Sequence, residues 1–429
     1  MNAERSRGGQ QAPEGYSWHR IDMTREGNYR YAEFLLPTEV EDQWHEDQRA
    51  AGAAEVERLV MSKMAPQSDL AQAVSSPTSS AYGSKSPSNN NEKFVRIFER
   101  GVSRRNRARR HPVLRAKEVL RVLDRISTIR NKEDRKREFE LMDRITSLGA
   151  LRDVANPVFE PEKWGRAVAR LRESHPHFRE VTDFVCEQVA LFGLSREPLS
   201  IPPIHIWGPP GIGKSHYATD LALALGAPLR RQSMENAQTT SLLLGTERHW
   251  STATPGLVFD QIVLGKYANP VFLIDEIDKA PPNSSYDPLV PLHSLLEPFT
   301  AATVCDAALD ITFDARLAIY IAASNDPNKI PQSLRSRFTE FEISRPSGED
   351  ALQIAQVVAC SAVDELSVPG FSAPEPRLAF KLAHLDSRAI RKAVQSAVAR
   401  AVLNGRKHLT SADFSLVDLD EEARPRVLH

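Results

Sequence analysis

Between residues 201 and 346, short apolar runs alternate with longer stretches of helical spacing. Parallel strands need crossover connections, which are usually helices, so this alternation predicts a parallel sheet with helices on both faces. The expected fold class is therefore α/β. The five runs predicted as strands of one sheet are Ile204–Trp207, Leu229–Gln232, Val271–Ile274, Leu317–Ala322 and Glu340–Ile343.

After the last of these runs the pattern is helical. One helix is expected to begin after Ser347, and a second to lie between Asp386 and Gly405 with its apolar side chains on one face. A short last helix should begin at Thr410, because Asp413 three positions later completes a capping box. The expected divisions are an α/β subdomain at 201–346, a helical subdomain at 347–417 and a tail at 418–429.

The first 200 residues divide by composition. Residues 1–64 are mixed and predict no particular fold. Residues 65–92 are rich in serine, proline and asparagine and have too little apolar surface to fold, so a disordered linker is predicted. Residues 93–200 are basic and show helical spacing, which indicates a basic helical arm whose densest run is Arg104–Arg110.

Composition narrows the class of protein without defining a function. Of 429 residues, 41% are hydrophobic and the net charge is -1, so the chain is globular and its total charge does not indicate nucleic acid. It has no apolar run near the roughly 18 residues of a membrane helix and no secretory signal, so we expect no membrane association and a cytoplasmic location. Three widely spaced cysteines fit neither a disulfide framework nor a zinc knuckle. The histidines lack zinc-protease spacing, and His175 and His177 are expected to be a surface pair.

The strongest chemical signal is Gly-Pro-Pro-Gly-Ile-Gly-Lys-Ser at 208–215, a G-x-x-x-x-G-K-[ST] loop between a predicted strand and a predicted helix. Glycines let backbone N–H groups converge on phosphate oxygens, and the following helix N-terminus adds partial positive charge. Lys214 is expected to reach the β- and γ-phosphates, and the Ser215 hydroxyl to bind Mg²⁺. The predicted nucleotide-binding residues here are Gly208, Pro209, Pro210, Gly211, Ile212, Gly213, Lys214, Ser215 and His216.

Two acids, Asp275 and Glu276, follow the apolar strand that begins at Val271. Ligands of open α/β sheets bind at the carboxyl ends of the strands. Asp275 is therefore expected to bind the nucleotide and hold Mg²⁺ with Ser215, and Glu276 to act as the base that activates the attacking water. An acidic helix N-terminus would show the same residues, but their place after a phosphate loop favours catalysis.

Two later segments hold further candidates. Asn325 follows the fourth predicted strand and would donate to the γ-phosphate or to the water, although a turn-forming Asn-Asp-Pro gives the same pattern and spacing does not decide. Arg335 and Arg337 lie just before the fifth strand. Either could neutralise transition-state charge in a neighbouring subunit, and solvated surface arginines are the alternative.

Several of these segments occur together in one known family. They are the loop 208–215, the strand with Asp275 and Glu276, Ser324-Asn-Asp326, Ser333-Leu-Arg-Ser-Arg-Phe338, and the run Gly245–Gly256. Together they resemble an AAA+ ATPase module, and within that class the ATPase part of Lon-type ATP-dependent proteases. The resemblance covers roughly residues 175–417 and implies a P-loop α/β subdomain followed by a helical lid.

The resemblance also implies roles for single residues. Asn325 matches the sensor-1 residue, Arg337 the arginine finger with Arg335 as the fallback, and Arg388 the sensor-2 arginine that reaches the nucleotide from the lid. Trp250 matches the aromatic pore-loop residue, which is tyrosine in Lon, and Tyr286 is assigned to a second pore loop. Lon carries its peptidase after the lid, where this chain has twelve residues, so no peptidase activity is expected.

The set predicts a Mg²⁺-dependent ATPase that assembles as a homo-hexameric ring and remodels a protein substrate, with a separate protease or adaptor as a possible partner. The alternative is an AAA+ ATPase that acts on DNA through the run Arg104–Arg110, which a solvated helix face or an acidic partner would also explain. A binder that holds ATP without turnover is disfavoured by the intact set of Glu276, Asn325 and the arginines.

Overall fold

The computed structural model of the chain describes residues 16–22, 31–37, 87–103, 107–129, 131–195, 197–235, 241–247, 253–281 and 287–414. The chain divides into two compact units. The first unit comprises Met1–Arg100 and Val119–Ala150, and the second comprises Gly101–Glu118 and Leu151–His429. The predicted nucleotide-binding residues all belong to the second unit.

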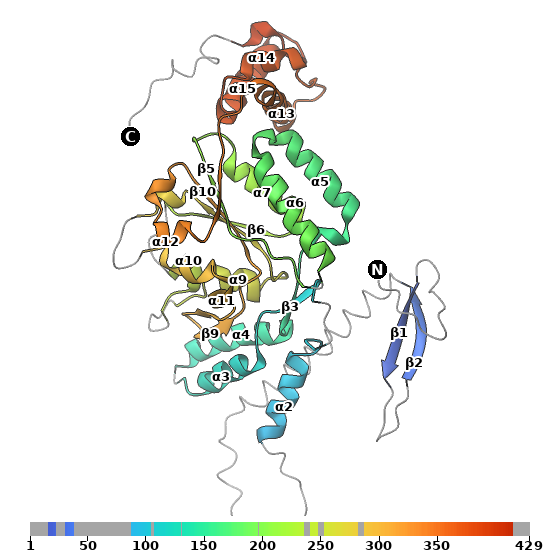
Figure 1. Ribbon diagram of the computed structural model, residues 1–429, viewed down its shortest axis with the longest axis vertical. Coiled ribbons are helices and arrows are strands. Elements are labelled where there is room, and N and C mark those ends of the chain that lie inside the picture. Colours follow the sequence, from blue (N-terminus) through green and yellow to red (C-terminus); the bar gives the residue numbers. More distant parts are fainter. Residues whose placement is uncertain are drawn as a thin grey trace, which may run out of the picture. The chain divides into compact units, whose positions relative to one another are not determined.

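The second unit is built on a five-stranded parallel sheet with the strand order β11-β5-β10-β7-β6. This confirms the predicted α/β fold. Figure 1 labels strands β5, β10 and β6 of this sheet. The central strands β7 and β10 are buried at every position, as expected of a parallel sheet covered on both faces. The strand bounds are β5 Ile204–Trp207, β6 Leu229–Ser233, β7 Val271–Asp275, β10 Ile319–Ser324 and β11 Thr339–Glu342.

One predicted strand is shifted along the chain. Leu317 and Ala318 precede β10, because the N–H of Ala318 bonds to Ala315 in a turn and the ladder starts where Ile319 bonds to Pro270. The strand consequently ends at Ser324 and not at Ala322. Its polar end therefore lies at the same edge of the sheet as the end of β7.

Helix α7 (Lys214–Leu225) packs against the sheet, and α5 (Pro161–Ser174) packs against α7. Phe178 connects these layers by stacking on Tyr217 with 4.3 Å between ring centroids. Helix α6 (Arg179–Leu194) follows Phe178 and packs on α5. The remaining α-helices between the strands are α8 Ser241–Leu244, α9 Leu257–Val263, α10 Val290–Leu295, α11 Pro298–Ala301 and α12 Gln332–Arg335.

The C-terminal part of the second unit consists of α13 (Gly348–Leu366), α14 (Ala379–Leu382) and α15 (Ser387–Leu403). Its core is rich in alanine, which lets the helices approach closely. The Asp386 side chain caps α15 by accepting the N–H of Ala389 at 2.7 Å. The predicted capping box of Thr410 and Asp413 is present at a short 3₁₀ turn.

Two antiparallel pairs in the second unit do not appear among the sequence predictions. The pair β3 (Arg110–Pro112) and β4 (Leu151–Asp153) lies inside the segment predicted to be a helical arm, which is therefore not all helix. Strands of three residues are too short to show the alternation of apolar and polar residues that identifies a strand. Their pairing was also not predictable, because β3 and β4 are far apart in the sequence. The other pair is β8 (Val304–Asp306) and β9 (Ile311–Phe313).

The first unit holds an antiparallel hairpin, β1 (Tyr16–Asp22) with β2 (Tyr31–Pro37), and the helices α2 (Pro87–Phe98) and α4 (Lys132–Leu148). Helix α3 (Ala116–Ser127) begins in the second unit and continues into the first. The linker prediction for 65–92 is wrong at its end, because α2 starts at Pro87 and is anchored by the buried, stacked rings of Phe94 and Phe98. Among the described helices, none combines the length and apolarity required to span a bilayer.

Candidate nucleotide-binding site

The phosphate loop lies between the end of β5 at Trp207 and the start of α7 at Lys214. At Gly208 a Cβ atom would lie 2.2 Å from the carbonyl oxygen of Ile343, so a larger residue cannot fit without moving the backbone. Gly213 has φ of 96°, in the left-handed region that glycine adopts without strain. Both glycines therefore serve the shape of the loop.

The Lys214 ammonium lies inside this loop. Its Nζ donates to the carbonyl oxygens of Gly208 at 2.7 Å and Pro209 at 2.9 Å, and to Oδ1 of Asn325 at 2.8 Å. Burial lowers the pKa of Lys214 from 10.5 to about 8, although Asp278 and Asp275 oppose that shift. The cation is therefore held by oxygens from both the loop and the end of β10.

Asp275 ends β7 and is buried. Its Oδ2 accepts the Ser215 hydroxyl at 2.7 Å, and the Arg231 guanidinium lies 2.6 Å from the same oxygen. A hydroxyl and a carboxylate are the oxygen donors that Mg²⁺ prefers, so these residues fit a magnesium site. Arg231, on β6, had no predicted role, because its place on the strand beside β7, opposite Leu273, follows from strand pairing and not from sequence spacing.

Glu276 has φ of 54°, a left-handed conformation that is uncommon for a residue other than glycine. Its carboxylate accepts Lys279 Nζ at 2.7 Å and the Ser233 hydroxyl at 3.3 Å. The hydrogen bond from Lys279 is the main cause that lowers the Glu276 pKa. The carboxylate is thus ionised and lies at the carboxyl edge of the sheet.

Asp278 lies in the site although no role was predicted for it. Its Oδ2 accepts the backbone N–H groups of both Asn325 and Asp326, each at 3.1 Å. This contact fixes the end of β10 so that the Asn325 side chain meets Lys214. In the sequence, the only sign of this role was a third acid after Asp275 and Glu276. The hydrogen bonds show that Asp278 positions Asn325.

The two arginines before β11 make different contacts. Arg335 is paired with Glu340 through two hydrogen bonds of 2.9 and 2.8 Å. Glu340 also accepts from buried His205, whose other ring nitrogen bonds the Ser324 hydroxyl at 2.8 Å. Arg337 instead donates to the carbonyl oxygen of Ser333, in its own segment. Arg335 therefore supports the edge of the sheet.

The start of α15 lies against the phosphate loop. A Cβ at Gly211 would come within 3.0 Å of Asp386 Oδ2. Arg388, two residues further on, is exposed, and its charge contributes to lowering the Lys214 pKa, after the larger effect of burial. The helical subdomain thus brings the predicted Arg388 to the same end of the sheet as Lys214.

The histidines differ from the prediction of a surface pair. His175 is buried with 5% of its surface exposed, and its Nε2 lies 2.8 Å from Asp220 Oδ2. His177 Nε2 donates to the carbonyl oxygen of Ile212 in the phosphate loop at 2.8 Å. Burial lowers the His177 pKa, so this ring is neutral at physiological pH. The expectation failed because the two histidines lie at a short 3₁₀ turn whose Pro176 and Phe178 are buried in the core.

The described arginines of the basic run are engaged within the second unit. Arg107 pairs with Glu197 at 2.9 Å, Arg110 pairs with Asp153 at 3.1 Å, and the Arg109 guanidinium lies 4.2 Å from the centre of the Phe159 ring. These contacts give the run a structural role. The predicted pore-loop residues Trp250 and Tyr286 lie outside the described residues.

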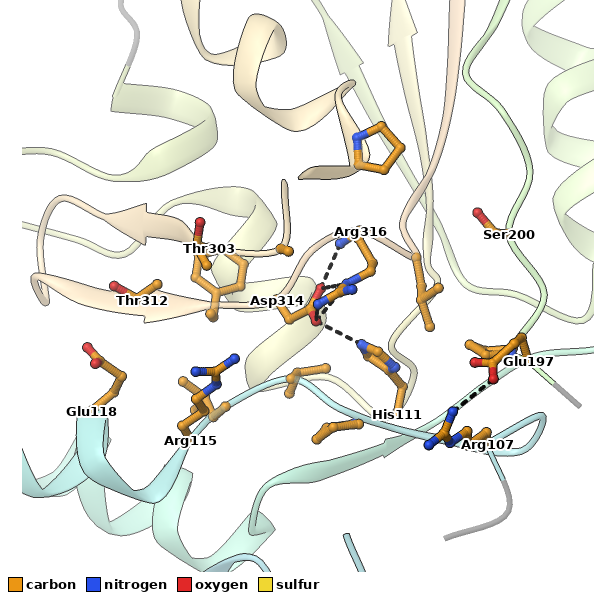
Figure 2. A pocket seen from close by; sticks show the side chains of 18 of the residues that line it. Arg107, His111, Arg115, Glu118, Glu197, Ser200, Thr303, Thr312, Asp314 and Arg316 are labelled. Carbon is orange, nitrogen blue, oxygen red and sulfur yellow. Dashed lines mark hydrogen bonds and ion pairs between the residues drawn. The ribbon is translucent and has the colours of Figure 1, made fainter. Parts of the chain in front are cut away.

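A cavity of about 660 Å³ lies elsewhere in the second unit, lined by the segment before α3 and by β9 (Figure 2). The side chains of His111 and Arg316 point toward Asp314, at 3.0 and 2.7 Å from its carboxylate. None of the lining residues belongs to the predicted nucleotide site. This cavity is therefore separate from the phosphate loop.

The site combines a phosphate loop, a buried carboxylate bonded to a hydroxyl, and a helical subdomain that lies against the loop. This combination is that of a P-loop nucleotide-binding module of the AAA+ type. In agreement, residues 204–345 match the family "ATPase family associated with various cellular activities (AAA)". Residues 204–345 are therefore an AAA ATPase domain.

Curated proteins similar to this chain are Lon proteases. The chain is 32% identical over 186 residues to "Lon protease" of Aster yellows witches'-broom phytoplasma, which is 43% of this chain and 23% of that protein. It is 31% identical over 186 residues to "Lon protease homolog 2, peroxisomal" of Caenorhabditis elegans, 43% of this chain and 24% of that protein. The chain thus spans about a quarter of the length of these relatives, and the similarity is that of a Lon-type AAA+ module.

Proposed function

We propose that this chain is a Mg²⁺-dependent ATPase that uses hydrolysis to unfold, translocate or remodel a protein substrate. The observation that carries the proposal is the convergence of Lys214, Ser215, Asp275, Glu276 and Asn325 at one edge of the sheet. Backbone N–H groups of the loop and the Lys214 ammonium would bind the phosphates. Ser215 and Asp275 would hold Mg²⁺, which when bound supplies positive charge to the phosphate oxygens.

Hydrolysis itself would depend on residues at the strand ends. The ionised Glu276 carboxylate would orient the attacking water and accept its proton. Asn325, positioned by Asp278, would donate to the γ-phosphate or to that water. Because Arg335 is engaged by Glu340, Arg337 is the better candidate for an arginine that acts on a neighbouring subunit. The assembly we propose is a homo-hexameric ring with nucleotide between subunits, in which Arg388 would contact nucleotide from the lid.

A protein substrate is supported by the similarity to Lon proteases. The DNA alternative rests on the basic run, whose described arginines are already paired inside the unit. We therefore favour protein over DNA as the substrate, with a separate protease or adaptor as a further partner and Trp250 and Tyr286 as the pore-loop residues.

The test is the full chain with Glu276→Gln, compared with Glu297→Gln, a change at an exposed carboxylate at the start of α11. Glu276→Gln should bind ATP normally and lower turnover about 10²–10⁴-fold, whereas Glu297→Gln should turn over normally. Failure of the unaltered chain to retain ATP with Mg²⁺ would overturn the proposal. Capture of bound macromolecules by Glu276→Gln with ATP should yield protein, and nuclease-sensitive material would support the DNA alternative instead.

A further inference from the structure

Two histidines and an aspartate face one another beside the phosphate loop. His175 ends α5, and His216 and Asp220 lie one turn apart on α7. The three facing atoms are His175 Nε2, His216 Nδ1 and Asp220 Oδ2. The distances between them are 2.8 Å from His175 to Asp220, 3.2 Å from His216 to Asp220, and 3.3 Å between the two histidines.

This triangle has the size of one face of a tetrahedral metal site. Zinc bonds to nitrogen and oxygen are about 2.0–2.1 Å long, which places neighbouring ligand atoms of a tetrahedron about 3.3 Å apart. Two edges, 3.2 and 3.3 Å, match that value and the 2.8 Å edge between His175 and Asp220 is shorter, so a metal ion above the triangle requires these two side chains to move apart. All three atoms also lie within 4.8 Å of one another.

The chemistry of the donors indicates the class of metal. Two imidazole nitrogens with one carboxylate oxygen suit Zn²⁺, Co²⁺ or Ni²⁺, whereas Mg²⁺ prefers oxygen donors. Three protein ligands leave a fourth position for water. The side chains of His216 and Asp220 are 60% and 34% exposed and that of His175 is 7% exposed, so the site has a rigid inner ligand and an open outer side.

The ionisation of Asp220 also suits the binding of a divalent cation. Burial tends to raise the Asp220 pKa, but hydrogen bonds with His175 and His216 outweigh it and hold the carboxylate ionised. A divalent cation would bind there when each ring carries its proton on the other nitrogen and presents the lone pair of the facing nitrogen.

We propose that His175, His216 and Asp220 form a binding site for a divalent transition metal such as Zn²⁺, separate from the magnesium site of Ser215 and Asp275. The metal would connect the end of α5 to the first turns of α7, the helix that carries Lys214 and Ser215. Its effect would be to fix the phosphate-loop helix against the preceding layer.

The test uses the full chain, stripped of metal by a chelator and free of nucleotide. Calorimetric titration with Zn²⁺ alone should show one equivalent that Asp220→Ala and His216→Gln each weaken about 100-fold or more. His408→Gln, at an exposed histidine of the helical subdomain, should keep that equivalent, and Ser215→Ala should keep it as well. Co²⁺ should give the visible absorption of tetrahedral cobalt in the unaltered chain and not in Asp220→Ala.

Binding should also raise the melting temperature by about 5 °C at zinc concentrations a hundredfold above the dissociation constant. The shift should be absent in His216→Gln, whose altered side chain is exposed and does not disturb the core. The proposal is overturned if the chain binds no Zn²⁺ at micromolar concentrations, or if Asp220→Ala and His216→Gln bind it as the unaltered chain does. Because no nucleotide is used, these outcomes are independent of whether the chain hydrolyses ATP.

Discussion

The ammonium nitrogen of Lys214 lies 2.8 Å from Oδ1 of Asn325, a residue 111 positions further along the chain. The same nitrogen also bonds the carbonyl oxygens of Gly208 and Pro209. The end of β10 is thereby connected directly to the cation of the phosphate loop. Any ligand that attracts Lys214 must also change its contact with Asn325.

Substitutions at Asn325 separate binding from turnover. Asn325→Asp places a carboxylate 2.8 Å from Lys214, where it competes with phosphate, so we expect ATP to bind about 10-fold more weakly or worse. Asn325→Ala should leave ATP affinity within about threefold and slow hydrolysis about 10–100-fold. Fluorescent-nucleotide titration and steady-state hydrolysis measure the two effects, and equal ATP affinity in the two variants would contradict this explanation.

The different contacts of the two arginines lead to a mixing experiment. Arg337→Ala and Glu276→Gln should each reduce hydrolysis about 10³-fold. If Arg337 acts on a neighbouring subunit, a mixture of the two variants contains some sites with both residues intact and should regain activity. A mixture that stays as inactive as its parts would show that Arg337 acts within its own subunit or not at all.

Arg335→Ala serves as the comparison, because Arg335 pairs with Glu340 in the same chain. We expect this variant to have a lower melting temperature. Mixing it with Glu276→Gln should not raise the hydrolysis rate above that of the two variants measured separately. Differential scanning fluorimetry beside the hydrolysis assay distinguishes the two arginines.

Gly208 has no room for a side chain. Gly208→Ala should destabilise the second unit by about 1–3 kcal/mol, because its Cβ would lie 2.2 Å from the Ile343 carbonyl oxygen. The matched control is Gly165→Ala in α5, where a Cβ meets no atom within 4 Å. There alanine should stabilise the helix by about 0.5–1 kcal/mol. Urea unfolding of both variants gives the comparison, and equal effects of the two changes would refute it.

Arg231 contacts the same Asp275 oxygen that is proposed to hold Mg²⁺. The Arg231 guanidinium lies 2.6 Å from Oδ2 of Asp275 and is 60% exposed, so its removal should leave the carboxylate freer for Mg²⁺. The arginine side of the pair is exposed although Asp275 is buried, so we expect an effect near the upper end for exposed pairs, about 1 kcal/mol, and Arg231→Gln should lower the Mg²⁺ concentration for half-maximal hydrolysis about 5-fold. Arg230→Gln, on the opposite face of β6, should leave that concentration unchanged. A higher Mg²⁺ requirement in Arg231→Gln would show that Arg231 supports the metal site.

Acid should destabilise the sheet through His205. Burial lowers the His205 pKa below its usual 6.5, although Glu340 opposes this; Arg335 and Asp278 are the other charges that face the ring. Below pH 6.5 the unfolded chain therefore binds a proton that the folded chain does not, and stability falls as the pH falls. The melting temperature should drop between about pH 7.5 and about pH 5.5. His205→Asn should show a smaller drop than His408→Asn, and equal drops would exclude His205 as the cause.

The α/β subdomain was largely predictable because its signals are local. An apolar strand followed by a glycine-rich loop predicted β5 and the start of α7, and the predicted strands agree with the observed sheet within about two residues at each end. The capped starts of α15 and of the Thr410 turn were equally readable, since a cap depends on residues three positions apart.

The contacts that could not be predicted from the sequence are those between segments far apart in the chain. Arg231 meets Asp275 through strand pairing, and Asp278 meets the backbone after β10. His175 meets Asp220 between two helices. Nothing in the spacing of these residues marks them, because side chains from different elements come together only when the sheet and its helices are assembled.

The close approach of Gly211 to Asp386 gives the phosphate loop a second constraint. The carboxylate that starts α15 occupies the space in which any side chain at position 211 would lie. A rotation of the helical subdomain about its connection to β11 would therefore have to withdraw this carboxylate before the loop could change shape. The absence of a side chain at Gly211 is therefore what lets the start of α15 lie this close to the phosphate loop.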